Sequence, residues 1–249
     1  MTDIGARDIA IVSGGASGLG RAVGQRLAER GAKVLLLDVH EDAGQAAALA
    51  IGAEFIACDV SSRGDWARVR AHVAANLGTP SLISFNAGVM TRPASAPLGD
   101  DPFAWIEKGG YARAFDVNVH GISYGLEALL PLMGDSGGAV VATVSIAGLM
   151  PTPFDPFYAA SKHAAIGLVR SVGPLLKRRR IRVNAFCPGP IATPLMPHEF
   201  LERTRSAMRP LDAADSILAI MMSSGTAEAW VRMTPDAPAV RFEFPALAG

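Results

Sequence analysis

The sequence predicts an α/β protein in which a doubly wound parallel sheet carries helices on both of its faces. Short apolar segments alternate with longer segments of helical spacing, which is the order of strands joined by helical crossovers. The apolar segments are hydrophobic throughout rather than at every second position, as strands buried on both faces are. Glycine or polar residues follow these segments directly, at the end of such a sheet where ligands bind.

Length and composition favour a single domain over residues 1–249. The chain has 249 residues, of which 50% are hydrophobic, and this is enough to form one large core. It contains no internal repeat, low-complexity tract or linker. Lysine and arginine together number 23, as do aspartate and glutamate, so the formal charge of zero gives no reason to expect a nucleic acid or an anionic membrane as a partner.

The cysteines and the hydrophobic runs bear on location. Cys58 and Cys187 lie far apart and lack the spacing of metal ligands, so we expect free thiols, no metal and a reducing compartment. Residues 1–7 lack the apolar core of a signal peptide. No apolar run reaches the length of about 18 residues that a membrane-spanning helix needs. These features predict a cytoplasmic protein without a membrane span.

The N-terminal part predicts a βαβ unit. It consists of an apolar strand at 8–13, a glycine-rich turn at 14–20, a helix within 21–33 that Gly31 stops, and a second buried strand at 33–39. Glycines let the backbone approach a pyrophosphate closely, and the helix N-terminus presents unpaired N–H groups to its charge. Asp38 can accept hydrogen bonds from both hydroxyls of an adenosine ribose. Gly15, Val39 and His40 offer no cation to a 2′-phosphate, so the pattern favours NAD over NADP.

Strands and helices continue to alternate after this unit. The further elements are a helix at 41–51, a strand at 54–57, a helix that Ser61 caps and that runs to Leu77, a strand at 81–85, one or two helices within 102–132 broken at Gly109 and Gly110, a strand at 137–145, a helix at 158–177, a strand at 181–186 and a last strand at 230–233. Residues 241–244 fit either an added edge strand or a segment that reaches a neighbouring subunit. The strand ends that should meet in one cleft carry Gly14, Asp38, Asp59, Asn86, Ser145 and Pro188.

Tyr158 and Lys162 are four residues apart and therefore share one face of the helix at 158–177. A free phenol has a pKa near ~10, and one ammonium roughly 4 Å away supplies the order of energy, ~4 kcal/mol, that would bring it to about 7. Ser145 can hold a carbonyl or alcohol oxygen beside the phenol. Taken alone, the pair also fits a core tyrosine and a solvated lysine, because this spacing is a loose pattern.

Taken in order, the motifs resemble those of the short-chain dehydrogenases/reductases over roughly residues 8–218. SGGASGLG at 13–20 corresponds to the family's TGxxxGxG with serine for threonine, and FNAG at 85–88 to its NNAG with Phe85 in place of the first asparagine. Ser145 stands thirteen residues before Tyr158, YAASK at 158–162 is the YxxxK motif, and Pro188-Gly189 is followed by Thr193. All of these motifs at family spacing are far more specific than any one of them.

The resemblance implies a Rossmann-type fold and a role for each matching residue. Tyr158 is the implied general acid/base, Lys162 lowers its pKa and binds the nicotinamide ribose, and Ser145 orients the substrate oxygen. Asn118 matches the helix asparagine that holds a water in a proton relay to Lys162. Asp59 and Val60 would hold the adenine edge. The cofactor-contacting positions are Gly14, Ser17, Gly18, Leu19, Gly20, Asp38, Asp59, Val60, Asn86, Ala87, Gly88, Tyr158, Lys162, Pro188, Gly189, Ile191 and Thr193.

The implied reaction is reversible hydride transfer between NAD and a secondary alcohol or ketone. Two rivals stay open, namely an epimerase or dehydratase on the same scaffold and a non-catalytic NAD-sensing protein. The intact set of Asn118, Ser145, Tyr158 and Lys162 argues against a sensor, which has no need of it. The resemblance also suggests a homodimer or homotetramer, paired through helices at 110–132 and 158–177.

Three loops are expected to line the substrate pocket, at 89–101, 146–157 and 190–209, and residues 190–210 are expected to form a lid that closes on bound cofactor. Their apolar side chains suggest an apolar small molecule of aromatic, alicyclic or steroid-like character. These side chains are Met90, Ile146, Leu149, Met150, Phe154, Leu195, Met196 and Phe200. Cations in the last loop could instead anchor an acidic group, and they are His198, Arg203, Arg205 and Arg209.

Overall fold

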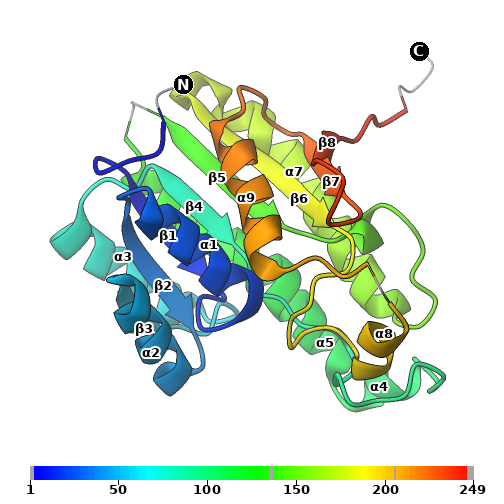
Figure 1. The fold of residues 1–249 in the computed structure, drawn as a ribbon. Helices are drawn as coiled ribbons and strands as arrows, with labels where there is room; N and C mark the ends of the chain where they lie inside the picture. Colours follow the sequence, from blue (N-terminus) through cyan, green and yellow to red (C-terminus); the bar gives the residue numbers. More distant parts are fainter. Residues whose placement is uncertain (1–2, 135–136, 205, 246–249) are drawn as a thin grey trace.

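A computed structural model describes residues 3–134, 137–204 and 206–245. Its centre is an eight-stranded sheet with the strand order β3-β2-β1-β4-β5-β6-β7-β8, in which β1 to β7 are parallel and β8 is antiparallel to β7 (Figure 1). The strands are β1 (Ile9–Ser13), β2 (Lys33–Asp38), β3 (Glu54–Ala57), β4 (Leu82–Phe85), β5 (Gly138–Thr143), β6 (Ile181–Pro188), β7 (Ala229–Arg232) and β8 (Val240–Arg241). The predicted doubly wound parallel sheet is confirmed.

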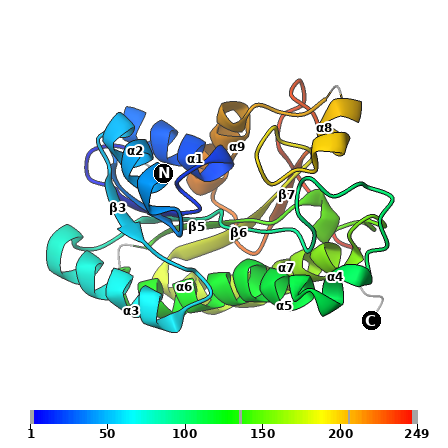
Figure 2. The same cartoon turned by 90° about the horizontal axis from the view of Figure 1, so that it is seen from below.

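Helices cover both faces of the sheet (Figure 2). They are α1 (Gly18–Glu29), α2 (Glu41–Ile51), α3 (Arg63–His72), α4 (Ala104–Glu107), α5 (Gly110–Phe115), α6 (Gly121–Leu129), α7 (Pro156–Leu176), α8 (His198–Arg203) and α9 (Pro210–Met222). One face carries α1, α2 and α9, and the other carries α3, α5, α6 and α7. A π-helical turn, η2 (Asp116–His120), joins α5 to α6.

The core consists of two apolar layers, one on each face of the sheet. Along β5, Val140 and Ala142 belong to the layer under α3, α6 and α7, whereas Ala139 and Val141 belong to the layer under α1 and α9. Successive strand residues point to opposite faces, so a strand buried on both sides must be apolar at every position. This is why the uninterrupted apolar runs predicted the sheet correctly.

Three local expectations need correction. Ser62, not Ser61, caps α3, since its Oγ accepts from Asp65 N at 3.2 Å, while Ser61 donates to the Asp59 carboxylate. The helix α1 begins at Gly18, inside the glycine-rich turn rather than after it. The strand β5 ends at Thr143, and Ser145 begins a short 3₁₀ turn, where its Oγ accepts from Ala147 N at 3.1 Å. The predicted break at Gly109, with φ 77°, is confirmed.

The segment after β7 forms the added edge strand that was one of two alternatives. Val240 and Arg241 pair with β7 as β8, and Phe242 N donates to Ala229 O at 2.8 Å. The Arg170 guanidinium of α7 lies 3.7 Å from the centre of the Phe244 ring. The C-terminal segment therefore covers the free edge of the sheet, which would otherwise expose unpaired backbone groups.

The described residues also bear on membrane spans, metal sites and cysteine chemistry. None of the helices in the described ranges is long and apolar enough to cross a membrane. Within the same ranges, no group of histidine, cysteine, aspartate and glutamate side chains is arranged to hold a metal ion. Cys58 and Cys187 are free and buried, and burial raises the pKa of each thiol to about 12.

Candidate active site

A cleft with a volume of about 960 Å³ opens at the carboxyl ends of the strands. All of the residues that the sequence predicts to contact a cofactor line it, and so do Ser145, Tyr158 and Lys162. Asn118 is fully buried and lies behind the cleft wall. The fold thus brings together residues from six strand ends, as a dinucleotide and a small substrate would require.

The glycine-rich turn brings main-chain atoms into close contact. Gly14 has a φ of 68°, and a Cβ added to it would stand 2.8 Å from Ala87 N. A Cβ on Gly20, in the first turn of α1, would stand 2.1 Å from Gly14 O. Both contacts require glycine, so the turn packs tightly on the end of β4, and residues 17–20 at the α1 N-terminus form a cradle in the cleft lining that suits a pyrophosphate.

Asp38 ends β2 at the rim of the cradle. Its Oδ2 accepts from Ala16 N at 3.1 Å and its Oδ1 accepts from His40 N at 3.0 Å, so the carboxylate is held in place by main-chain donors on both sides. Each carboxylate oxygen retains a further acceptor position. The half-buried Asp38 therefore fits the ribose-binding role that the sequence predicts, and its negative charge opposes a phosphate there.

The two departures from the family motifs are accommodated locally. The Ser13 hydroxyl accepts from Asn86 N at 3.2 Å and Ala87 N at 3.3 Å, and so holds the strand end beside the glycine-rich turn. Phe85 is buried and meets the Trp66 ring edge to face, with 6.0 Å between ring centres. Neither Ser13 nor Phe85 is part of the cleft lining.

Tyr158 and Lys162 lie one turn apart on α7 and are 7% and 3% exposed. The Lys162 Nζ donates to Thr143 O at 3.3 Å and lies 5.5 Å from the centre of the Tyr158 ring. The Ser145 side chain faces the Tyr158 phenol and acts to lower its pKa. A Cβ added to Gly88 would stand 3.3 Å from both Lys162 Nζ and Asn118 Oδ1. Ser145, Tyr158 and Lys162 therefore meet in the lining of the cleft, and Asn118 approaches Lys162 at Gly88 from behind the wall.

The ionisation of this group differs from the sequence expectation. Burial raises the pKa of Tyr158 to about 12, although the Ser145 side chain acts in the opposite direction. Burial also lowers the pKa of Lys162 to about 8. The expected lowering of the phenol pKa by Lys162 is not found, because that expectation counted one charge near the phenol and left out the desolvation of both groups.

Asn118 occupies the π-helical turn η2. Its Nδ2 donates to Val89 O and to Ser161 Oγ, both at 2.9 Å, and its Oδ1 accepts from Val89 N at 2.9 Å. The carboxamide thus fixes the first residue of the loop that follows Gly88. Its implied place in a water-mediated proton relay stays a prediction.

Sequence reasoning missed several groups around the site. The buried carboxylate of Asp155 caps α7, and Pro156 directly after it is a start signal that would have placed the helix boundary correctly. Arg92 is buried at the cleft wall and donates to Phe154 O at 3.0 Å and to the carbonyl groups of Pro97 and Leu98. Nothing in the residue spacing indicates these contacts, since they join separate loops.

The predicted substrate-lining residues fall into two groups. Met90, Leu195 and Met196 line the cleft. Outside the cleft lining are Ile146, Leu149, Met150, Phe154 and Phe200. Two of the cations that could have anchored an acidic group pair with carboxylates, Arg203 with Glu199 and Arg209 with Asp212. None of His198, Arg203 and Arg209 is part of the cleft lining. Arg205 lies outside the described residues.

The segment of residues 190–210 closes into a loop across the cleft. Met208 N donates to Pro190 O at 2.8 Å and Ala192 N to Met208 O at 2.9 Å, so its two ends are held together. On the far side, His198 N donates to Ala94 O at 2.9 Å and Leu98 N to the Glu199 carboxylate at 2.7 Å. The segment therefore contacts the loop that carries Met90 and Arg92.

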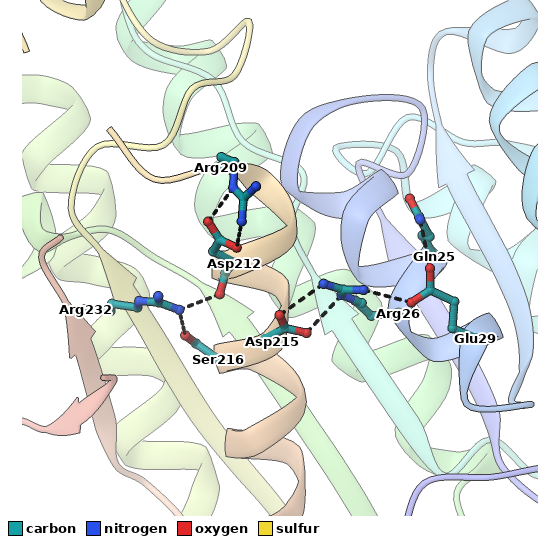
Figure 3. Close-up of polar contacts among 8 residues, drawn as sticks. All are labelled: Gln25, Arg26, Glu29, Arg209, Asp212, Asp215, Ser216 and Arg232. Atoms are coloured by element: carbon teal, nitrogen blue, oxygen red, sulfur yellow. Dashed lines mark hydrogen bonds and ion pairs between the residues drawn. The ribbon is translucent and has the colours of Figure 1, made fainter. Parts of the chain in front are cut away.

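Charged contacts fix the helix that follows this segment (Figure 3). Arg26 of α1 pairs with Asp215 of α9 at 2.9 Å, and Arg209 makes two hydrogen bonds to Asp212 within the first turn of α9. Arg232 of β7 donates to Ser216 Oγ at 3.0 Å and to the Asp212 carbonyl. The base of the 190–210 segment is thereby tied to both α1 and the sheet.

Comparisons with known proteins agree with this geometry. A family model described as short chain dehydrogenase matches residues 8–203. The 2,5-dichloro-2,5-cyclohexadiene-1,4-diol dehydrogenase of Sphingobium indicum is 32% identical over 200 residues, which are 79% of this chain and 77% of that protein. The 3-beta-hydroxysteroid dehydrogenase of Comamonas testosteroni is 33% identical over 192 residues, 76% of this chain and 72% of that protein.

A solved structure supports the same assignment. The crystal structure of levodione reductase has a TM-score of 0.80 to this structure at 27% identity, over 91% of this chain and 96% of that one. The family match, these relatives and the motifs gathered in the cleft lead to one conclusion. The chain belongs to the short-chain dehydrogenase family of oxidoreductases.

Proposed function

We propose that this protein is an NAD-dependent oxidoreductase that interconverts a secondary alcohol and a ketone. The observation that carries the proposal is the cluster of Ser145, Tyr158 and Lys162 in the floor of a cleft whose other end holds the glycine-rich turn and Asp38. A bound nicotinamide would accept or supply the hydride. The residues present fit such a cofactor, because the main chain at Gly14 and Gly20 packs too closely for side chains and the glycine-rich turn lines the cleft at the N-terminus of α1.

In this reaction the protein positions the substrate oxygen and moves its proton. Ser145 donates to the oxygen. The Tyr158 phenol donates a proton to that oxygen in ketone reduction, and the Tyr158 phenolate takes one from it in alcohol oxidation. Lys162, held at the Thr143 carbonyl, binds the ribose next to the reacting centre and supplies positive charge there. With the Tyr158 pKa near 12, the phenol is protonated at neutral pH, which suits donation to a ketone.

Asp38 favours NAD over NADP. Its carboxylate is fixed by Ala16 N and His40 N, and the neighbouring Val39 and His40 bring no lysine or arginine to a 2′-phosphate. A phosphate beside a fixed carboxylate would suffer repulsion that the ribose hydroxyls do not.

The substrate is proposed to be an alcohol or ketone on an apolar ring. Met90, Leu195 and Met196 line the cleft together with Pro93, Pro194 and other apolar groups, so the walls favour hydrocarbon. Two of the relatives act, by their names, on a cyclohexadiene diol and on a hydroxysteroid. The 190–210 segment is proposed as the lid over this pocket, since Thr193, Leu195 and Met196 line the cleft and His198 N reaches Ala94 O on the loop that carries Met90.

The test measures the formation of NADH with a panel of secondary alcohols, including cyclohexanol, 1-phenylethanol and a 3β-hydroxysteroid, with NADP in parallel. We expect ring alcohols to be oxidised with NAD, and Asp38→Ser to raise the use of NADP relative to NAD. Product analysis distinguishes the rivals, because an epimerase or dehydratase turns over without net NADH. A protein that binds NAD and converts none of these alcohols or their ketones would contradict the proposal.

We also propose a homodimer or homotetramer paired through α5, α6 and α7. The aromatic residues Tyr111 and Phe157 at the start of these helices contact each other, with ring centres 5.8 Å apart, and Tyr111 is 42% exposed. Sedimentation velocity measures the assembly, and a monomer at all concentrations would contradict it.

A further inference from the structure

We propose that Asp155 is a positioning residue that fixes the substrate wall at Met90 relative to the catalytic Tyr158. It does so through a pair of contacts, one to Thr91 and one to the main chain of Tyr158. The inference rests on the proposed function, since it assigns Met90 to the substrate wall and Tyr158 to proton transfer.

Asp155 joins two elements that lie far apart in the sequence. On the side of α7, its Oδ1 accepts from Tyr158 N at 3.1 Å as the N-cap of the helix. On the side of the loop after β4, its Oδ2 accepts from Thr91 N at 3.1 Å and its Oδ1 accepts from the Thr91 hydroxyl. One carboxylate therefore sets the distance between the helix start and the loop.

The loop between β4 and α4 is clamped on both sides of Met90. The main-chain N–H and C=O of Val89 both bond to the Asn118 carboxamide. The main-chain N–H and the hydroxyl of Thr91 both donate to the Asp155 carboxylate. Met90 stands between them, lines the cleft, and belongs to the buried apolar cluster that contains Tyr158. With both neighbours held, the backbone at Met90 is fixed, and this sets where its side chain enters the cleft beside Tyr158.

The chemistry at this position requires a carboxylate. Three donors converge on Asp155, and they use both of its oxygens, one from Thr91 N and the other from Thr91 Oγ1 and Tyr158 N. An asparagine offers one acceptor oxygen and would turn an N–H₂ group toward one of the donors. Asp155 is 0% exposed, and a carboxylate that deep in the protein is tolerated only when donors satisfy it.

Asp155 differs from an ordinary helix cap because it also holds Thr91, and the structure contains an ordinary cap for comparison. Ser62 caps α3 by accepting from Asp65 N, outside the cleft, and therefore provides a matched control for the loss of a cap. Asn is as good an N-cap as Asp. Asp155→Asn thus preserves the cap at Tyr158 N while it removes the acceptor for Thr91 N.

The kinetic experiment uses the full chain with NAD and cyclohexanol, or the best alcohol of the panel. For Asp155→Asn we expect kcat/KM for the alcohol to fall by about 10- to 100-fold, the range that a misplaced reacting group produces, while the Kd for NAD changes less than about twofold. Thr91→Val should lower kcat/KM in the same direction and Thr91→Ser should restore it. Ser62→Ala should leave kcat/KM unchanged.

A double-mutant cycle makes the test specific. Asp155→Asn removes the acceptor of Thr91 N, and Thr91→Val removes the hydroxyl that donates to Oδ1, so both loosen the same pair of residues. The double variant should therefore lose less in kcat/KM than the product of the two single losses. Losses that multiply would overturn the proposal, as would wild-type kinetics in Asp155→Asn. If Asp155→Asn does not fold, Thr91→Val against Thr91→Ser decides the question by itself.

Amide hydrogen exchange tests the contact without any turnover. In Asp155→Asn the Thr91 amide should exchange at least about tenfold faster, while the Tyr158 amide keeps its protection because its cap remains. An unchanged Thr91 amide would overturn the inference. If the wild-type protein oxidises no alcohol and Asp155→Asn still shows this exchange pattern, the proposed function fails while the positioning contact stands.

Discussion

Tyr158 shows how the environment of one residue alters its chemistry. The sequence places a lysine one turn away, and the structure confirms that both side chains face the same floor of the cleft. Burial, however, acts against the charged form of each, so the phenol holds its proton more tightly and the ammonium less tightly than in water. In the protein alone, the pair is therefore closer to a protonated phenol beside an ammonium that readily loses its proton than to a phenolate–ammonium ion pair.

Replacement of the phenol tests its role in proton transfer. For Tyr158→Phe we expect a Kd for NAD within about twofold of the wild type and a kcat lower by about 10²- to 10⁴-fold, the usual contribution of general acid/base catalysis. Fluorescence titration measures the Kd and steady-state kinetics the kcat. A variant with near-normal kcat would show that Tyr158 does not transfer the proton.

Replacement of the lysine tests its ionisation. Burial lowers the Lys162 pKa from 10.5 to about 8, so between these values the unfolded chain binds the proton more tightly than the folded one. The stabilising contribution of Lys162 is therefore present above pH 10.5 and is lost as the pH falls through 8. Relative to wild type, Lys162→Met should be most stable near pH 7 and should lose up to ~3 kcal/mol of that advantage by about pH 10.5.

Urea unfolding at several pH values measures this difference in the free energy of unfolding. The exposed Lys177→Met, at the end of α7, serves as the matched control for loss of a lysine. If the difference between Lys162→Met and wild type is the same at every pH, the lysine is not desolvated as the structure has it.

At the scale of elements, the glycine-rich turn and α1 depend on close approach between main-chain atoms. The turn passes so near the end of β4 that Gly14 touches Ala87, and the first turn of α1 rests on Gly14 through Gly20. The contrast with α7 is useful, because Gly167 lies on its exposed surface with nothing within 4 Å of an added Cβ. The same exchange to alanine should therefore have opposite effects at these two positions.

We expect Gly20→Ala to abolish measurable NAD binding, since its Cβ would stand 2.1 Å from Gly14 O and must displace the cradle. Gly167→Ala should instead raise the free energy of unfolding by ~0.5–1 kcal/mol, because alanine suits a helix interior better than glycine. Calorimetric titration with NAD and urea unfolding measure the two effects. Wild-type affinity in Gly20→Ala would contradict the cradle.

At the scale of the whole molecule, the sheet depends on protection of its last edge. The strand β8 adds antiparallel to β7, and beyond it Phe244 packs on the core layer under α7 and beneath Arg170. These contacts lie away from the lining of the cleft. The C-terminal segment should therefore contribute to stability and solubility without a direct part in the chemistry.

Removal of residues 239–249 tests this separation. We expect the truncated chain to lose ~2 kcal/mol of unfolding free energy, the order of one cation–π contact and a few main-chain hydrogen bonds, and to aggregate more readily at the exposed edge. Its kcat should stay within about twofold of the full chain. Phe244→Ala serves as a smaller step in the same direction. A large loss of kcat with normal stability would assign the segment a role in catalysis instead.

The sequence by itself determined the order of strands and helices and the glycine-rich turn, because these depend on local periodicity and on motifs within a few residues of each other. The cofactor positions that line the cleft came from the resemblance of these motifs to a known family. Alternation of apolar runs predicted β1 to β7, and Gly109 predicted the break before α5. Local boundaries such as the cap of α3 were wrong by one residue, because adjacent serines compete for the same role.

Only the tertiary structure decided the pKa values in the site, the choice of Met90, Leu195 and Met196 as cleft walls, and the place of the C-terminal segment. It also decided the contact between Thr91 and Asp155, which are 64 residues apart. Desolvation and long-range hydrogen bonds depend on what the rest of the chain packs around a group. No pattern of neighbours along the chain records that surrounding.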